Sequence, residues 1–499
     1  MSVGTFAEYA DYDAVGLADL VRLGDVSASE LVETAIARVE ELNPRLNAVI
    51  AKHYDSARRL AASGPPAGPF RGVPFLIKDL AFVAGDVATL GSVFFRDFTP
   101  DVSSEYIRRV LAAGFIPIGR TNSSEFGLLP TTEPVLHGPT RNPWSTEYSA
   151  GGSSGGAAAA TAAGIVPVAH ASDGGGSIRI PASACGVFGL KPSRGRMPRF
   201  PAAAADYLSL DLAVSRSVRD SAALLDATHG EVPGGAYRVP PPEGSFLDAV
   251  ATDPEPMTIA FAFDDFRGRR VDRECVLAVE SVVATLEGAG HRLVEASPAV
   301  DGQSLAEAFL VVWESMAEGI FGLILDEASK RRSARVLRRL LGDWRTMKLI
   351  ARIDQRKAGQ PAFEPFTWRL ANNSRRRTPA LLEAAKTELQ RVSHAVGAFL
   401  EEYDMHLTPA LGLPPLRLGA IDQEAKWDEV IEQLFDYVAF TPVANFSGLP
   451  AMSVPTHWTG SGLPVGTHFA GRHGAEADLL SLAGQLERAV PWWPRRPQL

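Results

Sequence analysis

Apolar side chains recur at helical spacing near the start of the chain, directly after a helix-start pattern. Ser27 and Glu30 have the spacing of a capping box, in which each side chain bonds the other residue's backbone N–H. Apolar residues then follow on one helical face, at Leu31, Val32, Ala35, Ile36, Val39 and Leu42. We therefore predict a helix that starts after Ser27 and ends at Asn43 and Pro44, within an N-terminal helical segment over residues 1–60.

The pattern changes near residue 70, where continuous apolar runs alternate with helical stretches. Val73 to Ile77 is an uninterrupted apolar run that ends at Lys78, and it indicates a strand buried on both faces. Residues 157–163 are alanine-rich and predict a helix, and residues 165–169 predict another strand. Strands that alternate with helices over residues 70–230 indicate an α/β layer structure with a largely buried sheet and loops at the strand ends.

The second half of the chain is different in composition. Pro and Gly gather between residues 233 and 245, which indicates a linker or a long surface loop. Residues 303–404 are rich in helix formers and contain large apolar side chains, at Trp313, Met316, Phe321, Trp344, Phe363, Phe366 and Trp368. We predict that this segment forms a helical cap region. The alternative is that these side chains are ordinary core.

Composition and charge narrow the classes of function. Of the 499 residues, 46% are apolar and 21% are charged, which is typical of a globular protein with a large core. The net charge of -9 argues against a nucleic acid partner, because phosphate binding needs clustered Lys and Arg. The basic runs at residues 330–339 and 375–377 are interpreted as solvated helix faces.

Neither the cysteines nor the apolar segments point to export or to a membrane. Cys185 and Cys275 are too few for a disulfide framework and lack the spacing of a zinc site, which favours a reducing compartment and no metal. The first residues are acidic and do not resemble a secretory signal. The apolar stretch 309–325 is interrupted by two glutamates, so we do not expect it to span a membrane. We expect a cytoplasmic protein.

Two glycine-rich loops contain the serines that most strongly indicate catalysis. Ser153 lies in the run 151–156, and Ser177 lies 24 residues later at the end of the run 173–177. A serine hydroxyl is a weak nucleophile, so it needs a nearby base and N–H donors for the oxyanion that its attack creates. Glycines before Ser177 allow successive backbone N–H groups to converge on one anion.

Lys78 is the candidate base because it follows the predicted buried strand. A lysine can accept a proton only when it is neutral, and at an ordinary pKa about one molecule in 2,500 is neutral at pH 7. Burial disfavours the charged ammonium and can lower a lysine pKa by up to about 3–5 units. The two serines and Lys78 together indicate a hydrolase.

These residues are part of a longer series of motifs that resembles the amidase signature family. The matching stretches reach across nearly the whole chain, at residues 72–79, 119–127, 141–144, 151–156, 173–192, 445–451 and 462–466. The resemblance implies a single domain over residues 1–499, with an α/β fold of one large mixed β-sheet covered by helices on both faces. It further implies a signature catalytic core at residues 70–230 and an amidase that uses no cofactor.

The family resemblance also implies a role for each catalytic residue. Ser177 would be the nucleophile and would form the acyl-enzyme. Ser153 would relay the proton of Ser177, across a cis peptide bond after Gly152, and Lys78 would be the terminal base. The oxyanion hole would consist of the backbone N–H groups of Gly174, Gly175, Gly176 and Ser177.

Three further residues would support this centre. Ser154 would hold the loop and the lysine, and Asp173 and Arg179 would brace the turn. The substrates of such an enzyme are small molecules with a C–N bond, such as linear or cyclic amides, anilides or carbamates (urethanes). We expect no nucleic acid or membrane partner, and either a monomer or a homodimer.

Within the family the chain resembles bacterial amidases of the 6-aminohexanoate-cyclic-dimer hydrolase type, in the run 131–134, the loop 172–176 and the closing residues 491–499. In those relatives an asparagine shortly before residue 131 helps to hold the substrate amide, and Leu128 stands there in this chain. We therefore predict a pocket with an apolar wall that favours bulky or aromatic groups. Its predicted residues are Gly127, Leu128, Leu129 and Thr131.

Other interpretations of the same loops stay open. Gly151, Ser153 and Gly155 also match the nucleophile elbow of α/β-hydrolases, which would make Ser153 the nucleophile of an esterase with an Asp and a His partner. His170 lies between the two serines and is interpreted as structural. The chain would alternatively be an amidotransferase-type subunit that releases ammonia within a multisubunit complex. The glycine loops lack the motifs of a nucleotide phosphate site.

Overall fold

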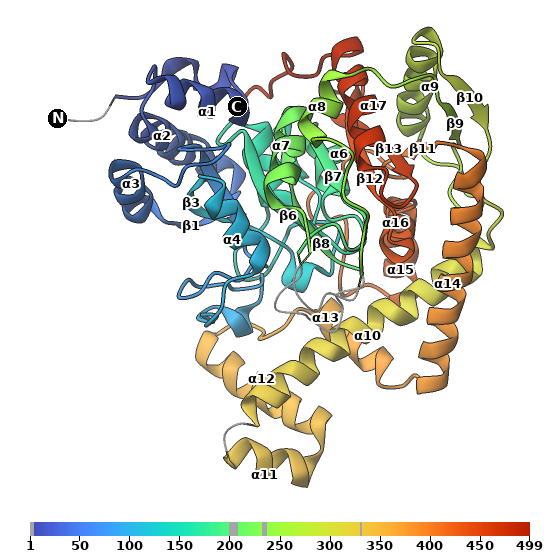
Figure 1. Ribbon diagram of the computed structural model, residues 1–499. Coiled ribbons are helices and arrows are strands. Elements are labelled where there is room, and N and C mark those ends of the chain that lie inside the picture. Colours follow the sequence, from blue (N-terminus) through green and yellow to red (C-terminus); the bar gives the residue numbers. More distant parts are fainter. Residues whose placement is uncertain (1–3, 199–207, 232–236, 330–331) are drawn as a thin grey trace.

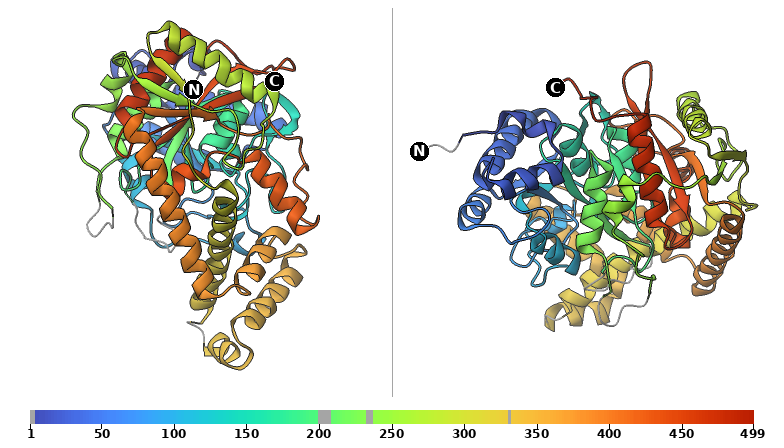
Figure 2. Two further views of the ribbon diagram at one scale, coloured as in Figure 1. Left: turned by 90° about the vertical axis from the view of Figure 1, so that its right-hand side faces the viewer. Right: turned by 45° about the horizontal axis from the view of Figure 1, so that its top comes forward.

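The structure, a computed structural model, describes residues 4–198, 208–231, 237–329 and 332–499. Within these residues one sheet of 11 strands runs through the molecule and is flanked by helices (Figures 1 and 2). The strand order is β1-β3-β2-β6-β8-β7-β12-β13-β11-β9-β10. Strand β2 is parallel to β3 and β6, whereas β6 is antiparallel to β8, so the sheet is mixed. The α/β fold class predicted from the sequence is confirmed.

The strands of the large sheet are β1 Val49–Lys52, β2 Pro74–Lys78, β3 Ile116–Thr121, β6 Val168–Asp173, β7 Phe188–Lys191, β8 Leu210–Ser215, β9 Thr258–Phe261, β10 Arg292–Glu295, β11 Met405–Pro409, β12 Ala451–Trp458 and β13 Pro464–Gly471. A small second sheet pairs β4 Arg141–Asn142 with β5 Ser145–Ser149.

The helices of the first half are α1 Ala14–Leu23, α2 Ala28–Leu46, α3 Tyr54–Ser63, α4 Glu105–Ala112, α5 Gly155–Ala162, α6 Arg179–Cys185, α7 Val218–Thr228, α8 Phe246–Ala251 and α9 Arg273–Gly288. Those of the second half are α10 Gly302–Ala328, α11 Arg332–Leu341, α12 Asp343–Ala358, α13 Pro365–Ser374, α14 Pro379–Glu402, α15 Trp427–Tyr437, α16 Pro442–Ser447 and α17 Glu476–Ala489. Short 3₁₀ turns are η1 Ala7–Asp11, η2 Val93–Phe95 and η3 Glu125–Gly127.

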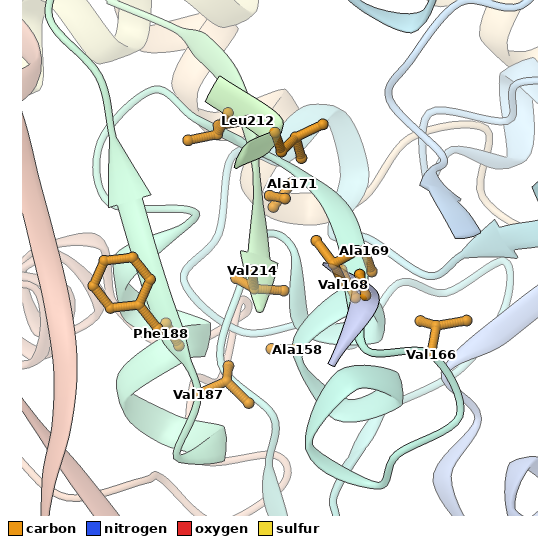
Figure 3. Close-up of a cluster of buried hydrophobic side chains, with 14 of the residues drawn as sticks. Ala158, Val166, Val168, Ala169, Ala171, Val187, Phe188, Leu212 and Val214 are labelled. Atoms are coloured by element: carbon orange, nitrogen blue, oxygen red, sulfur yellow. The ribbon is translucent and has the colours of Figure 1, made fainter. Parts of the chain in front are cut away.

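The core beside the catalytic loops is built from small side chains on a helix and branched ones on strands. Helix α5 is almost entirely alanine and glycine, and every one of its residues is buried. The small side chains allow the helix to pack closely on β6 and β8, next to Val168, Leu212 and Val214 (Figure 3). Truncating one of these buried aliphatic side chains to alanine costs about 1–5 kcal/mol of stability. This packing gives the two serine loops a rigid support.

Two expectations for the N-terminal segment need correction. Helix α2 does not end at Asn43; it continues through Pro44 to Leu46 and ends at Asn47, which has a left-handed conformation with φ 50°. The Asn43 side chain accepts hydrogen bonds from the N–H groups of Ala48 and Val49 and so stabilises the turn that follows. The segment 1–60 is also not wholly helical, because β1 forms the edge of the large sheet against β3.

A third expectation, the position of the strand before the second serine loop, was wrong in its boundaries. The strand predicted at residues 165–169 begins only at Val168, and it extends to Asp173. Gly164 adopts a left-handed conformation with φ 70°, and the N–H of Ile165 bonds back to the carbonyl of Ala160. Ile165 and Val166 therefore belong to the buried turn that follows α5. Of the predicted linker at 233–245, residues 233–236 lie outside the described residues, and 237–245 have no regular secondary structure.

Helices α10 to α14 follow one another between β10 and β11, and Figure 1 shows α11 and α12 extending away from the sheet. By length and composition alone α10 is long and apolar enough to cross a membrane, with a mean hydropathy of 1.7 over an 18-residue window. That measure does not test the expectation that residues 309–325 do not span one. In the structure α10 packs along α13 and α14.

Candidate active site

Lys78 lies at the end of β2, inside the large sheet, and its side chain is fully buried. The Nζ donates hydrogen bonds to the hydroxyls of Ser153 at 2.8 Å, Ser154 at 2.7 Å and Ser172 at 3.0 Å. Burial lowers the Lys78 pKa from its usual value to about 7, although Asp211 and Asp173 act in the opposite direction. A substantial fraction of the amine is therefore neutral near pH 7, as proton acceptance requires.

Ser153 lies on the loop between β5 and α5, and the peptide bond between Gly152 and Ser153 is cis. Gly152 has no room for a side chain, because a Cβ there would stand 2.7 Å from the backbone of Thr131. The hydroxyl of Thr132 holds the loop by donating to the carbonyl of Gly151 at 2.9 Å. Thr131 was predicted to line the substrate pocket, but it is buried behind this loop and does not line the cavity described below.

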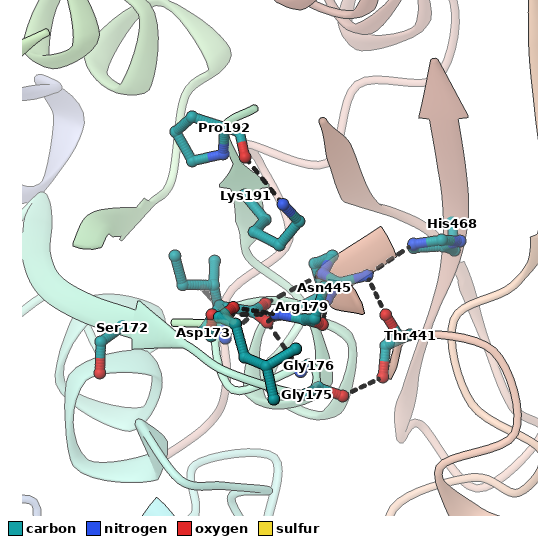
Figure 4. Close-up of polar contacts among 12 residues, drawn as sticks. Ser172, Asp173, Gly175, Gly176, Arg179, Lys191, Pro192, Thr441, Asn445 and His468 are labelled. Atoms are coloured by element: carbon teal, nitrogen blue, oxygen red, sulfur yellow. Dashed lines mark hydrogen bonds and ion pairs between the residues drawn. The ribbon is translucent and has the colours of Figure 1, made fainter. Parts of the chain in front are cut away.

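Asp173 and Arg179 form a buried ion pair under the second serine loop. Two hydrogen bonds of 2.9 Å join the guanidinium to the carboxylate, and Asn445 contacts both residues (Figure 4). Burial alone would raise the Asp173 pKa, but Arg179, Asn445 and Lys191 outweigh it and hold that pKa well below the usual range. The pair thus stays charged and fixes the loop between β6 and α6.

The hydrogen bonds that hold this loop remove one of the N–H donors expected for the oxyanion hole. Asp173 accepts the backbone N–H of Gly176 at 2.7 Å and that of Ile178 at 3.1 Å. The N–H of Gly176 was predicted to bind the oxyanion, and in the structure it is already bonded to a carboxylate. Thr441 bonds the neighbouring peptide from the other side, since its hydroxyl donates to the carbonyl of Gly175 at 2.8 Å. The remaining predicted donors on this loop are the N–H groups of Gly174, Gly175 and Ser177.

Ser177 lies on the wall of a cavity that is partly open to solvent and whose empty space, with the adjoining solvent included, is about 660 Å³. Of the predicted pocket residues, Gly127, Leu128 and Leu129 line it. From the sequence we predicted no other side chain in this pocket. Trp313 and Met316 were named only as large apolar residues of the helical segment. The further lining residues, mostly apolar, are Phe126, Pro130, Ile180, Phe309, Trp313, Met316, Leu434, Phe435, Val438 and Pro442.

Ser153 lies between Lys78 and this cavity. Its hydroxyl accepts from Lys78, and a Cβ on the cavity residue Gly127 would stand 3.2 Å from the same oxygen. Within the described residues no hydrogen bond joins Ser177 to Ser153. The structure therefore brings together Lys78, Ser153 and Ser154, and it places Ser177 on the wall of the neighbouring cavity without a direct bond to them.

A histidine partner for Ser153 is not found at this site. The ring of His170 contacts the backbone N–H of Lys78 and the carboxylate of Asp211. Ser153 instead has a lysine as its neighbour, which does not fit the nucleophile-elbow interpretation. Among the residues that the structure describes, no group of three or more His, Cys, Asp or Glu side chains is arranged to hold a metal ion.

Comparison with known sequences gives consistent matches over the whole chain. A family model described as Amidase matches residues 30–480. The 6-aminohexanoate-cyclic-dimer hydrolase of Paenarthrobacter ureafaciens is 34% identical, over 98% of this chain and 96% of that protein. The putative amidase AmiC of Mycobacterium leprae (strain TN) is 35% identical, over 97% of this chain and 96% of that protein.

Solved structures agree with these sequence matches. The 6-aminohexanoate cyclic dimer hydrolase complexed with substrate superposes with a TM-score of 0.86 and 32% identity, over 98% of this chain and 99% of that one. A bacterial aryl acylamidase of the amidase signature family gives a TM-score of 0.81 and 27% identity, over 96% of both chains.

The chain therefore belongs to the amidase signature family. It is an amidohydrolase that acts on carbon–nitrogen bonds other than peptide bonds.

Proposed function

We propose that the protein hydrolyses amides through an acyl-enzyme on Ser177, with Ser153 as proton relay and Lys78 as base. The observation that supports this most strongly is the buried amine of Lys78, which bonds the hydroxyl of Ser153 at 2.8 Å beside the cavity that holds Ser177. A buried lysine with a pKa of about 7 can alternately accept and return a proton near neutral pH.

The reaction begins when the Ser177 Oγ adds to the carbonyl carbon of the substrate. Its proton passes through Ser153 to neutral Lys78, in a contact between the serines that forms as substrate binds. The negative oxygen is stabilised by N–H groups of the loop at Gly174, Gly175 and Ser177. The C–N bond then breaks, and the proton on Lys78 returns through Ser153 to the leaving amine.

Water completes the cycle by the same route in reverse order. It adds to the carbonyl carbon of the acyl-enzyme and gives its proton through Ser153 to Lys78. The bond between Ser177 and the acyl carbon breaks, the proton returns to the Ser177 oxygen, and the carboxylic acid is released. A carbamate carbonyl is open to the same addition, so urethanes are included in the proposed substrates.

The cavity supports amides with a bulky apolar or aromatic group as substrates. Leu128, Leu129, Trp313 and Met316 line it, so burial of a hydrophobic group contributes binding energy there. Aryl amides are the first class to test, because one structural neighbour is an aryl acylamidase. The test is release of p-nitroaniline from p-nitroanilides and from N-(p-nitrophenyl) carbamates by the purified protein. The proposal predicts turnover by the wild type and none by Ser177→Ala; equal turnover by both would overturn it.

A further inference from the structure

One wall of the substrate cavity is the pocket turn, residues 126–129, and its backbone is held in a conformation that bulky residues rarely adopt. Phe126 has φ 51°, and Leu90, on the loop that faces the turn, has φ 54°. A left-handed backbone at a bulky side chain persists only where the surrounding structure holds it. The N–H of Phe126 donates to the carbonyl of Leu90 at 2.8 Å, so the two residues support each other. The shape of this wall therefore depends on the groups that hold both segments.

A buried carboxyl group holds the loop of Leu90. Asp79 directly follows Lys78 and is fully buried. It accepts the N–H of Thr89 at 3.0 Å and that of Gly91 at 3.1 Å, and the Thr89 hydroxyl donates to it as well. Leu90 lies between these two N–H groups, so its conformation is fixed from the side of the catalytic lysine.

A second buried carboxyl group, Glu125, holds the pocket turn from the side of the helical region, and the mechanism above does not use it. Glu125 directly precedes the turn and accepts the hydroxyl of Ser92 at 2.6 Å. Its other oxygen accepts the N–H of Glu364 at 2.9 Å and the hydroxyl of Thr367 at 2.5 Å. Glu364 is the N-cap of α13, and Thr367 lies in the first turn of that helix. Glu125 therefore joins the pocket turn, the loop that contains Ser92 and helix α13.

Glu125 fits this position as a neutral acid. Burial, with the nearby Glu364 carboxylate, raises its pKa to about 8. Its proton can be donated to the Ser92 hydroxyl, which in turn lies 3.3 Å from the carbonyl of Ala362. Loss of the proton puts a negative charge in a buried position beside Glu364 and should loosen this junction.

The carboxyl groups that face Glu125 do not offset such a charge. Glu364 accepts the N–H of Val135 at 2.9 Å and the side-chain amide of Gln423 at 2.8 Å. Glu133 is the next carboxyl group beyond Glu364 and acts on it. Both groups are acidic, so neither neutralises an ionised Glu125.

We propose that Glu125 is a positioning residue for substrate selection: it fixes the pocket turn against Ser92 and helix α13, and so sets the wall that meets the substrate. This inference rests on the proposed function, which places the substrate in this cavity. Glu125 does not line the cavity itself, so it acts through Phe126 and the residues that follow.

Removal of the side chain tests this role. Glu125→Ala should raise KM for p-nitroacetanilide about 10-fold relative to KM for a small aliphatic amide such as propionamide, with little change in kcat. Glu125→Gln keeps the shape and the hydrogen-bonding groups of the neutral acid, and it should recover most of the loss. Glu383→Ala, at an exposed glutamate of α14, is the matched control. If Glu125→Ala does not fold, Thr367→Val removes one of the three donors and should raise the same KM ratio by a smaller factor.

The pH dependence of KM separates this role from a merely structural one. In the wild type, KM for p-nitroacetanilide should rise as the pH passes through about 8, because Glu125 ionises, whereas kcat follows the titration of Lys78 near pH 7. The rise in KM should be absent in Glu125→Gln, which cannot ionise. A merely structural residue would lower the folded fraction and leave KM and its pH dependence unchanged.

An unchanged KM ratio in Glu125→Ala would overturn the inference. So would a wild-type KM that is independent of pH, or a rise in KM that persists in Glu125→Gln. Failure of the proposed function is distinguishable, because the wild type would then turn over none of these amides. In that case equilibrium dialysis of p-nitroacetanilide against the Ser177→Ala protein tests the inference: adding Glu125→Ala should weaken binding about 10-fold, and equal affinity would overturn it.

Discussion

The loop that contains Ser177 and helix α10 face the same cavity, but they are built in opposite ways. The loop that ends at Ser177 is held by a buried polar network, in which Asp173 bonds Arg179 and the backbone N–H groups of Gly176 and Ile178. Helix α10 contributes apolar and aromatic side chains to the cavity, at Phe309, Trp313 and Met316. In the proposed mechanism the first region places atoms for chemistry, and the second provides a surface for substrate binding.

This difference explains why the reaction class is easier to infer than the substrate. A loop with a buried ion pair and glycines in close contact with neighbouring backbone tolerates few substitutions, so its sequence is distinctive. An apolar wall can be built from many combinations of side chains of suitable volume. The following predictions test this division, beginning with the largest expected effect.

Removal of the proposed nucleophile or base should abolish the chemistry without affecting the fold. Ser177→Ala and Lys78→Ala should each lower kcat/KM by about 10³-fold or more, since members of a catalytic unit act together. Steady-state release of amine measures the loss, and circular dichroism checks the fold. Ser461→Ala, on an exposed turn, is the matched control. Near-normal turnover by either variant would mean that the replaced residue does not have its proposed catalytic role.

The bracing network should matter more for stability than an ion pair in the helical region. Asp173→Asn leaves Arg179 charged in a fully buried position and should cost about 3–5 kcal/mol in the free energy of unfolding. Asp343→Asn breaks an exposed pair with Arg338 and should cost at most about 1 kcal/mol. Urea unfolding measures both. Equal losses would show that the loop is not held by its buried charges.

Substitution in the wall should change substrate preference and leave the titration of the base alone. Trp313→Ala should lower kcat/KM for a bulky aryl amide, relative to a small aliphatic amide, by about 10- to 100-fold. The acidic limb of the pH profile should not move. Trp344→Ala is the control, because this ring packs edge-to-face against Trp368 and does not line the cavity. A shifted limb in Trp313→Ala would contradict the separation of the two regions.

The smallest expected effect is on thermal stability, at a residue where the two regions meet. Glu125 is buried and accepts from Ser92 at 2.6 Å and from the N–H of Glu364 at 2.9 Å. Burial, with the nearby Glu364 carboxylate, raises the Glu125 pKa well above its usual value.

A carboxyl with a raised folded-state pKa stabilises the fold below its unfolded pKa and loses that contribution as pH rises through the folded value. The thermal midpoint should therefore fall as the pH rises from the usual carboxyl pKa of 4.5 to about 8, and it should fall less in Glu125→Gln. Parallel curves for the two proteins would show that Glu125 is not protonated in the fold.

The fold and the catalytic loops could be predicted from the sequence because their determinants are local. An apolar run followed by Lys78 is visible in consecutive residues, and so are the glycines before Ser177. The boundary of β6 could not be predicted, because Ile165 and Val166 are equally apolar in a strand or in a buried turn after a helix. Only the left-handed Gly164 and the bond from Ile165 to Ala160 decide between them.

The hydrogen bonds of the oxyanion loop and the residues of the pocket were harder to predict from the sequence, for a different reason. The use of the Gly176 N–H by Asp173 depends on a side-chain rotamer that Arg179 and Asn445 fix, and Asn445 is 272 residues away from Asp173 along the chain. Phe309 and Leu434 reach the cavity from helices whose direction no local pattern reveals. Thr131 was predicted in the pocket, whereas it is buried with its backbone against Gly152 and does not line the cavity.

The most direct test of the central claim is to trap the nucleophile. The protein is treated briefly with phenylmethylsulfonyl fluoride across a pH series, and intact mass and peptide mapping locate the adduct. We predict a single adduct on Ser177, absent in Ser177→Ala, whose rate of formation rises through about pH 7 as Lys78 loses its proton. An adduct on Ser153 would contradict the account. So would a rate of adduct formation on Ser177 that changes neither with pH nor in the Lys78→Ala variant.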